Sequence, residues 1–213
     1  LFYRLGDFYE MFFDDAKVVS KELELTLTGK SCGAEERAPM CGIPYHAAET
    51  YLTRLVKKGY KVAICEQVED PKLAKGMVKR EVTRVVTPGT TLNAQALDET
   101  KNNCIMCIAY IGDHYGISSA DITTGDYYVT EVDSERKLLD EVNKYQPTEI
   151  ICNEAFYISG IDIDDMKNRM GIVIYSLDAW YFSDETAETT LKGHFHVNSL
   201  EGLGLNDYAY GTI

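Results

Sequence analysis

The sequence predicts an α/β protein of two consecutive domains, a mixed α/β domain followed by a mixed sheet flanked by helices. Helix-like and strand-like segments alternate along its 213 residues, which is the order typical of α/β architectures. Charge is unevenly divided: residues 1–92 carry 14 Lys and Arg against 13 Asp and Glu, and residues 93–213 carry 7 against 21. A polar, weakly periodic stretch separates the halves. We therefore predict domains at 1–92 and 103–213, joined by a linker at 93–102.

The elements of the first domain follow from turn residues and hydrophobic periodicity. Asp14 and Asp15 favour the first turn of a helix, and Gly59 suits a helix end. Residues 1–13 form either a strand pair or one long bent strand. The other expected elements are helices at 14–23 and 47–58, strands at 25–28, 60–67 and 78–86, and a loop at 29–42.

The second domain begins with three strands joined by Gly-Asp and Thr-Thr-Gly-Asp turns. We expect these strands at 104–111, 115–121 and 126–131, then a helix capped by Ser134 and ending near Tyr145. Further strands are expected at 148–152 and 172–175. Three consecutive strands followed by alternating helix and strand indicate a mixed sheet with flanking helices.

Composition narrows the class of protein. With 45% hydrophobic and 26% charged residues the chain is an ordinary globular sequence, and it has no apolar run near the roughly 18 residues of a membrane-spanning helix. It begins inside an apolar run without Met, which we interpret as a fragment of a longer cytoplasmic protein. Of six cysteines, only Cys104 and Cys107 are close in sequence, and no second pair completes a zinc site. We expect reduced, mostly buried thiols and no metal.

The net charge of −13 argues against nucleic-acid binding by the chain as a whole. The two halves differ, however, with a net charge of +1 for residues 1–92 and −14 for residues 93–213. Only the first half can therefore tolerate a phosphate backbone. The acidic second half suits a domain that stays off DNA and meets protein partners.

The opening run, LFYRLGDFYEMFFDDA, raises the question of which way Phe8 points. If the run stays extended, its odd positions are almost all apolar and form the core face, which includes Tyr9. Phe8 and Glu10 then share the open face with Arg4 and Gly6. The alternative is that Gly6 bulges the strand, resets the alternation and buries Phe8. An exposed aromatic residue beside a carboxylate is typical of sites that anchor partners or unstack bases.

The same run resembles the amino-terminal region of the MutS family of DNA mismatch repair proteins, whose Phe-x-Glu motif falls here on Phe8 and Glu10. The resemblance continues in order through residues 39–46 (PMCGIPYH), 62–67 (VAICEQ) and 84–90 (RVVTPGT), and more loosely through 120–125 and 147–150. It implies that residues 1–92 are a mismatch-binding domain and that the rest is a ribonuclease-H-like connector domain.

The resemblance also implies partners and roles. The partners would be mismatched double-stranded DNA, a MutL-type protein bound through the connector, and a second copy joined through domains not represented here. Phe8 would enter the minor groove as a wedge at the weakened base step, and Glu10 would hydrogen-bond the mispaired base while repelling sound duplex. ATP and Mg²⁺ would belong to the family's ATPase domain. No Gly-x-x-x-x-Gly-Lys-Ser/Thr motif occurs, so this chain is not expected to be an enzyme.

Contacts with the DNA backbone should be unspecific and come from basic or loop residues. Lys75, Lys79 and Arg80, with Lys72 nearby, are one group of candidates, and the loop of Pro44, Tyr45 and His46 is the second. For both groups a solvated surface without DNA contact is an equal alternative. We assign His46 no catalytic or metal role.

Two other functions compete with mismatch binding. The first is a protein-interaction scaffold, in which Phe8 anchors a partner protein and DNA contact is incidental. The second is a two-metal nuclease built from the acidic residues of the second domain, namely Asp121, Asp126, Asp162, Asp164 and Asp165. We disfavour the nuclease, because Asp162, Asp164 and Asp165 form one acidic run that is typical of a helix start.

Overall fold

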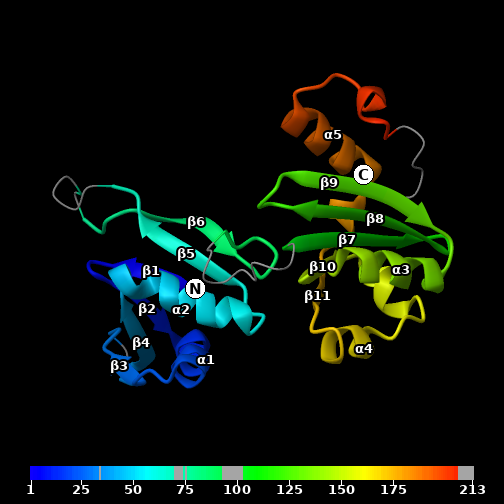
Figure 1. The fold of residues 1–213 in the computed structure, drawn as a ribbon. Helices are drawn as coiled ribbons and strands as arrows, with labels where there is room; N and C mark the ends of the chain where they lie inside the picture. The colour runs from blue at the N-terminus through cyan, green and yellow to red at the C-terminus, as the bar shows by residue number, and fades with distance from the viewer. Residues whose placement is uncertain (34, 70–73, 75, 93–102, 206–213) are drawn as a thin grey trace. The chain divides into compact units, whose positions relative to one another are not determined.

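A computed structural model describes the chain except for residues 34, 70–73, 75, 93–102 and 206–213 (Figure 1). The chain divides into two compact units, Leu1–Leu97 and Asp98–Ile213. The predicted linker at 93–102 lies outside the described residues. The predicted fold class is confirmed, since each unit is a mixed sheet with helices.

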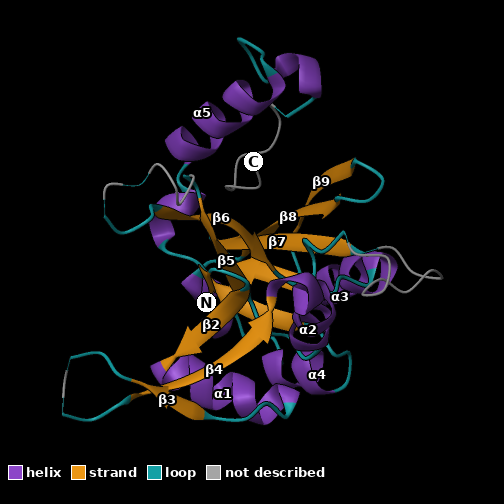
Figure 2. Cartoon of the chain, turned by 90° about the vertical axis from the view of Figure 1, so that its left-hand side faces the viewer, coloured by secondary structure: helices purple, strands orange, loops and turns teal. Residues whose placement is uncertain are grey.

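The first unit is a six-stranded sheet in the order β3-β4-β2-β1-β5-β6 (Figure 2). Strand β1 is parallel to β5, and every other neighbouring pair is antiparallel. Two helices, α1 (Phe13–Leu23) and α2 (Ala48–Lys57), pack on it, and a 3-10 turn (Tyr45–Ala47) precedes α2. The strands are β1 (Phe2–Leu5), β2 (Phe8–Phe12), β3 (Thr28–Lys30), β4 (Ala38–Pro44), β5 (Val62–Gln67) and β6 (Arg80–Val86).

The core of this unit lies between the two helices and one face of the sheet. Both helices contribute apolar residues at helical spacing, and the strands contribute Phe2, Tyr9, Met11 and Ile43 to the same cluster. The other face of the central strands carries half-buried and exposed side chains. The sheet therefore has one closed face and one open face.

Two expectations for this unit are wrong. Of the strand expected at 25–28, only Thr28 lies in a strand, because α1 ends in a left-handed cap at Glu24 and the backbone N–H of Leu25 donates to the Ser20 carbonyl to close that cap. The predicted loop at 29–42 contains most of β3 and most of β4. Glycine and proline suggested a loop, but Cys41 and Ile43 alternate into the core as a strand requires.

The second unit is a five-stranded sheet in the order β11-β10-β7-β8-β9. Strands β7, β8 and β9 form an antiparallel meander, while β10 and β11 run parallel to β7, so the sheet is mixed, as expected. Figure 1 shows α3 and α4 on one side of it and α5 on the other. The strands are β7 (Cys104–Ile111), β8 (His114–Asp121), β9 (Asp126–Val132), β10 (Glu149–Cys152) and β11 (Val173–Ser176), and the helices are α3 (Glu135–Tyr145), α4 (Ile163–Asn168) and α5 (Asp184–Phe195).

The described part of this unit also has short 3-10 turns at Glu154–Ile158, Ala179–Phe182 and Glu201–Leu203. Ser134 occupies the predicted capping position of α3, but its side chain makes no capping hydrogen bond. None of the helices in the described part of the chain is long and apolar enough to cross a membrane.

Candidate nucleic-acid interface

The turn between β1 and β2 presents Phe8 at the edge of the open face. Gly6 and Asp7 form this turn, and Gly6 has a φ of 57°, which glycine adopts without strain. Three hydrogen bonds fasten the turn. The N–H of Gly6 donates to Gln67 Oε1 at 2.9 Å, the N–H of Tyr45 donates to the Asp7 carbonyl at 2.9 Å, and Arg4 Nε donates to the Gly6 carbonyl. The backbone that carries Phe8 is thus fixed from three directions.

Phe8 and Tyr9 point to opposite faces of the sheet. Phe8 is 48% exposed, whereas Tyr9 is 5% exposed and packs against Phe2 with ring centroids 5.9 Å apart. Burial and a hydrogen bond to Glu66 raise the pKa of Tyr9 above its ordinary value. The exposure expected for Phe8 and the burial expected for Tyr9 therefore agree with the structure.

The alternation of side chains expected for residues 1–13 is only partly present. The run is a strand pair, and the turn at Gly6 does break the alternation of side chains between the two faces. The residues of β1 take the opposite face to the one expected, while Phe8 keeps the expected one. Phe2 is consequently buried, and Arg4 lies on the Tyr9 face, its guanidinium carbon 5.5 Å from the Tyr9 ring centroid. Phe13, assigned to the core by alternation, is exposed at the start of α1.

Glu10 lies two residues beyond Phe8 on the same open face. Its side chain is 17% exposed and forms an ion pair with Lys30 of β3. Its register partner on the neighbouring strand β4 is Gly42. A Cβ added to Gly42 would lie 3.7 Å from the Glu10 side chain and 3.9 Å from the Phe8 ring. Because Gly42 has no side chain, the surface of the open face is not filled between Phe8 and Glu10.

Lys30 is not indicated by the sequence. It falls in the stretch expected to be a loop, and nothing in its spacing connects it with Glu10. The register of β3, β4 and β2 brings the two residues to one face. The Lys30 ammonium also lies 5.6 Å from the centre of the Phe12 ring.

The loop candidates lie beside Phe8. Pro44 is the last residue of β4 and the register partner of Phe8, so the loop that follows begins next to Phe8. Tyr45 and His46 are exposed, and their rings meet edge to face with centroids 5.9 Å apart. The Arg4 guanidinium lies 3.9 Å from the Tyr45 ring centroid, which ties this loop to the turn.

The basic candidates are less uniform. Lys75, like Lys72, lies outside the described residues. Lys79 is exposed and pairs with Glu81. Arg80 is half-buried: it donates to the carbonyls of Arg4 and Val78, both at 2.7 Å. Its guanidinium therefore links β6 to the backbone of β1, on the far side of β5.

Several of the carboxylates considered for a nuclease make local structural contacts. Asp121 accepts hydrogen bonds from the N–H and hydroxyl of Thr123 and from the N–H of Asn103. Burial opposes its ionisation, but these bonds outweigh burial and hold the pKa of Asp121 below its ordinary value. Asp162 caps α4, as its sequence predicts, and Asp165 pairs with Arg169. Among the described residues, no three His, Cys, Asp or Glu gather as a metal site.

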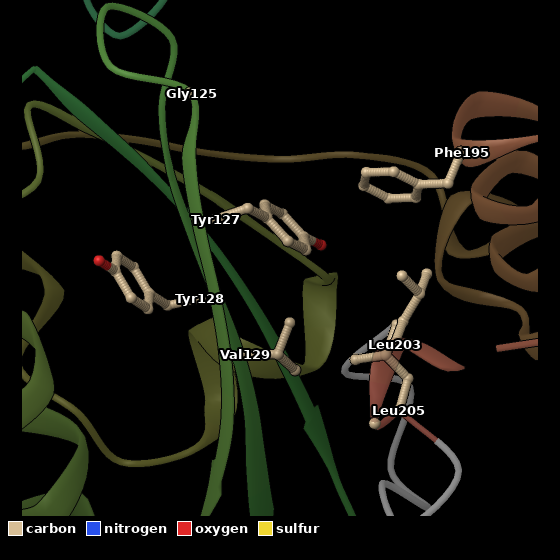
Figure 3. Close-up of a pocket in the computed structure, with 8 residues that line it drawn as sticks. Gly125, Tyr127, Tyr128, Val129, Phe195, Leu203 and Leu205 are labelled. Atoms are coloured by element: carbon tan, nitrogen blue, oxygen red, sulfur yellow. The ribbon is translucent and has the colours of Figure 1, made fainter. Parts of the chain in front are cut away.

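The second unit also has a surface hollow of about 420 Å³. Figure 3 shows Tyr127 and Val129 of β9 on one side and Phe195, Leu203 and Leu205 on the other. Tyr128 points to the far side of the strand, where its ring centroid lies 5.6 Å from that of Tyr145. The hollow is thus a groove with aromatic and aliphatic side chains in its walls, beside the edge strand of the sheet.

Comparison with known proteins agrees with this architecture. Residues 1–95 match the family model of MutS domain I, and residues 103–212 match that of MutS domain II. The chain is 66% identical over 212 residues to a DNA mismatch repair protein MutS of Lachnoclostridium phytofermentans, covering 100% of this chain and 23% of that protein. It is 52% identical over 203 residues to a protein of the same name from Ruminiclostridium cellulolyticum, covering 94% of this chain and 23% of that protein.

These matches define a class of DNA repair protein. The chain belongs to the MutS family of DNA mismatch repair proteins, and its two units correspond to the family's domains I and II. It spans less than a quarter of the length of these two relatives.

Proposed function

We propose that the first unit recognises mismatched or unpaired bases in duplex DNA, with Phe8 as a minor-groove wedge. The observation that carries the proposal is an exposed aromatic ring on a turn that three hydrogen bonds fasten. A wedge must unstack a base step at a cost of a few kcal/mol, roughly. Because the backbone that carries the ring is already held in place, binding costs less conformational entropy. Damaged pairing lowers the cost, so the wedge selects weak steps.

Glu10 is assigned the hydrogen bond to the displaced base. A carboxylate near phosphates is repelled; the ion pair with Lys30 offsets part of its charge, and on sound duplex no base donor compensates for the rest. At a mismatch, the displaced base supplies the donor. Pro44, Tyr45, His46 and Lys79 remain candidates for contacts with the backbone.

The test uses a full-length MutS protein that carries these two domains, because the family members are much longer than this chain. Binding to a G·T duplex and to its matched homoduplex is measured by fluorescence anisotropy. Phe8→Ala should reduce mismatch affinity to the homoduplex level. The control is Phe13→Ala, which removes an exposed phenylalanine from the start of α1. Retained preference in Phe8→Ala would remove the wedge assignment.

Glu10→Ala separates repulsion from simple affinity. It should raise affinity for the homoduplex, because the carboxylate no longer opposes the phosphates. An equal loss on both duplexes would contradict the repulsion argument. A protein-interaction scaffold predicts instead that Phe8→Ala abolishes capture of a partner protein and leaves DNA preference intact.

For the second unit we propose a protein partner of the MutL type. Its net charge of −14 over residues 93–213 disfavours a phosphate backbone, and the groove beside β9, with aromatic and aliphatic side chains in its walls, offers a protein contact surface. We assign dimerisation and the binding of ATP and Mg²⁺ to parts of the full-length protein outside this chain. The place of action would be the bacterial cytoplasm, at the nucleoid.

A further inference from the structure

Glu10, to which we assign the hydrogen bond to the displaced base, forms an ion pair with Lys30. Lys30 itself is given no contact with DNA in the proposed function. Lys30 reaches Glu10 from β3, across the intervening strand β4. Gly42 on β4 has no side chain to stand between Phe8 and Glu10. The pair therefore lies on the open face, beside the Phe8 wedge.

The exposure of the two side chains decides how firmly they are held. Lys30 is 43% exposed and Glu10 is 17% exposed. The pair is part-buried, and Lys30 is its more exposed partner, so a competing anion can reach the ammonium from solvent. A buried pair would be far harder to open. The geometry thus describes a contact that can be exchanged.

We propose that Lys30 is a specificity-determining residue that couples base recognition to phosphate binding; this inference rests on the proposed function. At a mismatch, the displaced base takes the Glu10 carboxylate, and the released Lys30 ammonium pairs with a nearby phosphate. On sound duplex no base donor competes, and Lys30 stays with Glu10. Mismatch recognition therefore adds one phosphate contact.

The number of phosphate contacts is measured by the salt dependence of binding. Each phosphate neutralised on duplex DNA contributes about −0.9 to the slope of log K against log salt concentration. The wild-type slope should therefore be steeper by about 0.9 on a G·T duplex than on homoduplex. Lys30→Gln should remove this difference by lowering the G·T slope alone.

A second pair of variants tests the exchange itself. Glu10→Gln removes the partner of Lys30, so the ammonium becomes available on both duplexes, and the homoduplex slope should steepen by about 0.9. Adding Lys30→Gln to this variant should reverse that steepening. Lys17→Gln is the matched control, because Lys17 forms an exposed ion pair with Asp14 on α1, away from the open face. It should leave the slope difference unchanged.

The outcomes distinguish this inference from the proposed function. Wild-type protein that does not prefer the G·T duplex would refute the proposed function itself. Preserved preference with equal slopes on both duplexes would refute only the exchange. An equal fall of both slopes in Lys30→Gln would make Lys30 an ordinary phosphate contact, and no change in either would leave it a purely structural residue; both results overturn the proposal.

Discussion

Substitution of Gly42 separates the stability of the sheet from the use of its open face. Gly42 lies on β4 opposite Glu10, and its φ lies outside the left-handed region. An added Cβ would meet the Tyr9 carbonyl oxygen at 3.4 Å and the Phe8 ring at 3.9 Å, which are ordinary contacts. Glycine within a strand is less favourable than alanine by about 0.5–1 kcal/mol. Gly42→Ala should therefore be neutral or raise the free energy of unfolding by up to about this amount.

Gly42→Val places two more methyl groups between Phe8 and Glu10. Valine suits a strand, so the variant should fold stably. The displaced ring would lose its stacking on the base, a contact worth roughly 1–3 kcal/mol, or about 5- to 150-fold in affinity. Mismatch preference should fall within that range, while Gly42→Ala keeps most of it.

Two measurements decide the matter. Chemical denaturation gives the stability of each variant, and anisotropy titrations with G·T duplex and homoduplex give the preference. A loss of more than about 1 kcal/mol in Gly42→Ala would show that the position is not open. Unchanged preference in a stable Gly42→Val protein would show that this face does not meet DNA.

The remaining predictions concern stability and reactivity. Asp121→Asn should lower the free energy of unfolding by about 1–3 kcal/mol at neutral pH. Because the folded pKa of Asp121 is lowered, this difference should shrink as the pH falls through that value, and urea melts at acid pH check it. Cys32 should react with iodoacetamide in the native protein, whereas Cys41 and Cys152, whose pKa burial raises to about 11 and about 12, should react only after unfolding. Arg80→Gln should destabilise by about 1–3 kcal/mol; unchanged melts would leave Arg80 available for phosphates.

The sequence predicts most elements of the second unit because its strands alternate regularly and end at glycine turns. It also predicts the opposite facing of Phe8 and Tyr9, since both lie in one strand after the turn. It misplaces Phe2 and Arg4 because alternation cannot continue through Gly6 and Asp7. A turn changes which side chains face the core, and the composition of the run does not show at which residue the turn begins.

The candidate site is predictable only where its residues are close in the sequence. Phe8 and Glu10 are found by their spacing, and Pro44 to His46 by their position in a resembling block. Lys30 and the support of the turn by Gln67 depend on strand order and register, which join residues 20 and 61 positions apart. Long-range pairing of this kind leaves no local pattern in the sequence.

A 2-aminopurine placed next to a G·T mismatch reports whether Phe8 unstacks the weakened base step. Its fluorescence is quenched by stacking, so an inserted ring should raise the emission when the wild-type full-length protein binds. Phe8→Ala at saturating concentration should bind without this rise, and Phe13→Ala should show it in full. The same rise with Phe8→Ala as with the wild type would contradict the account.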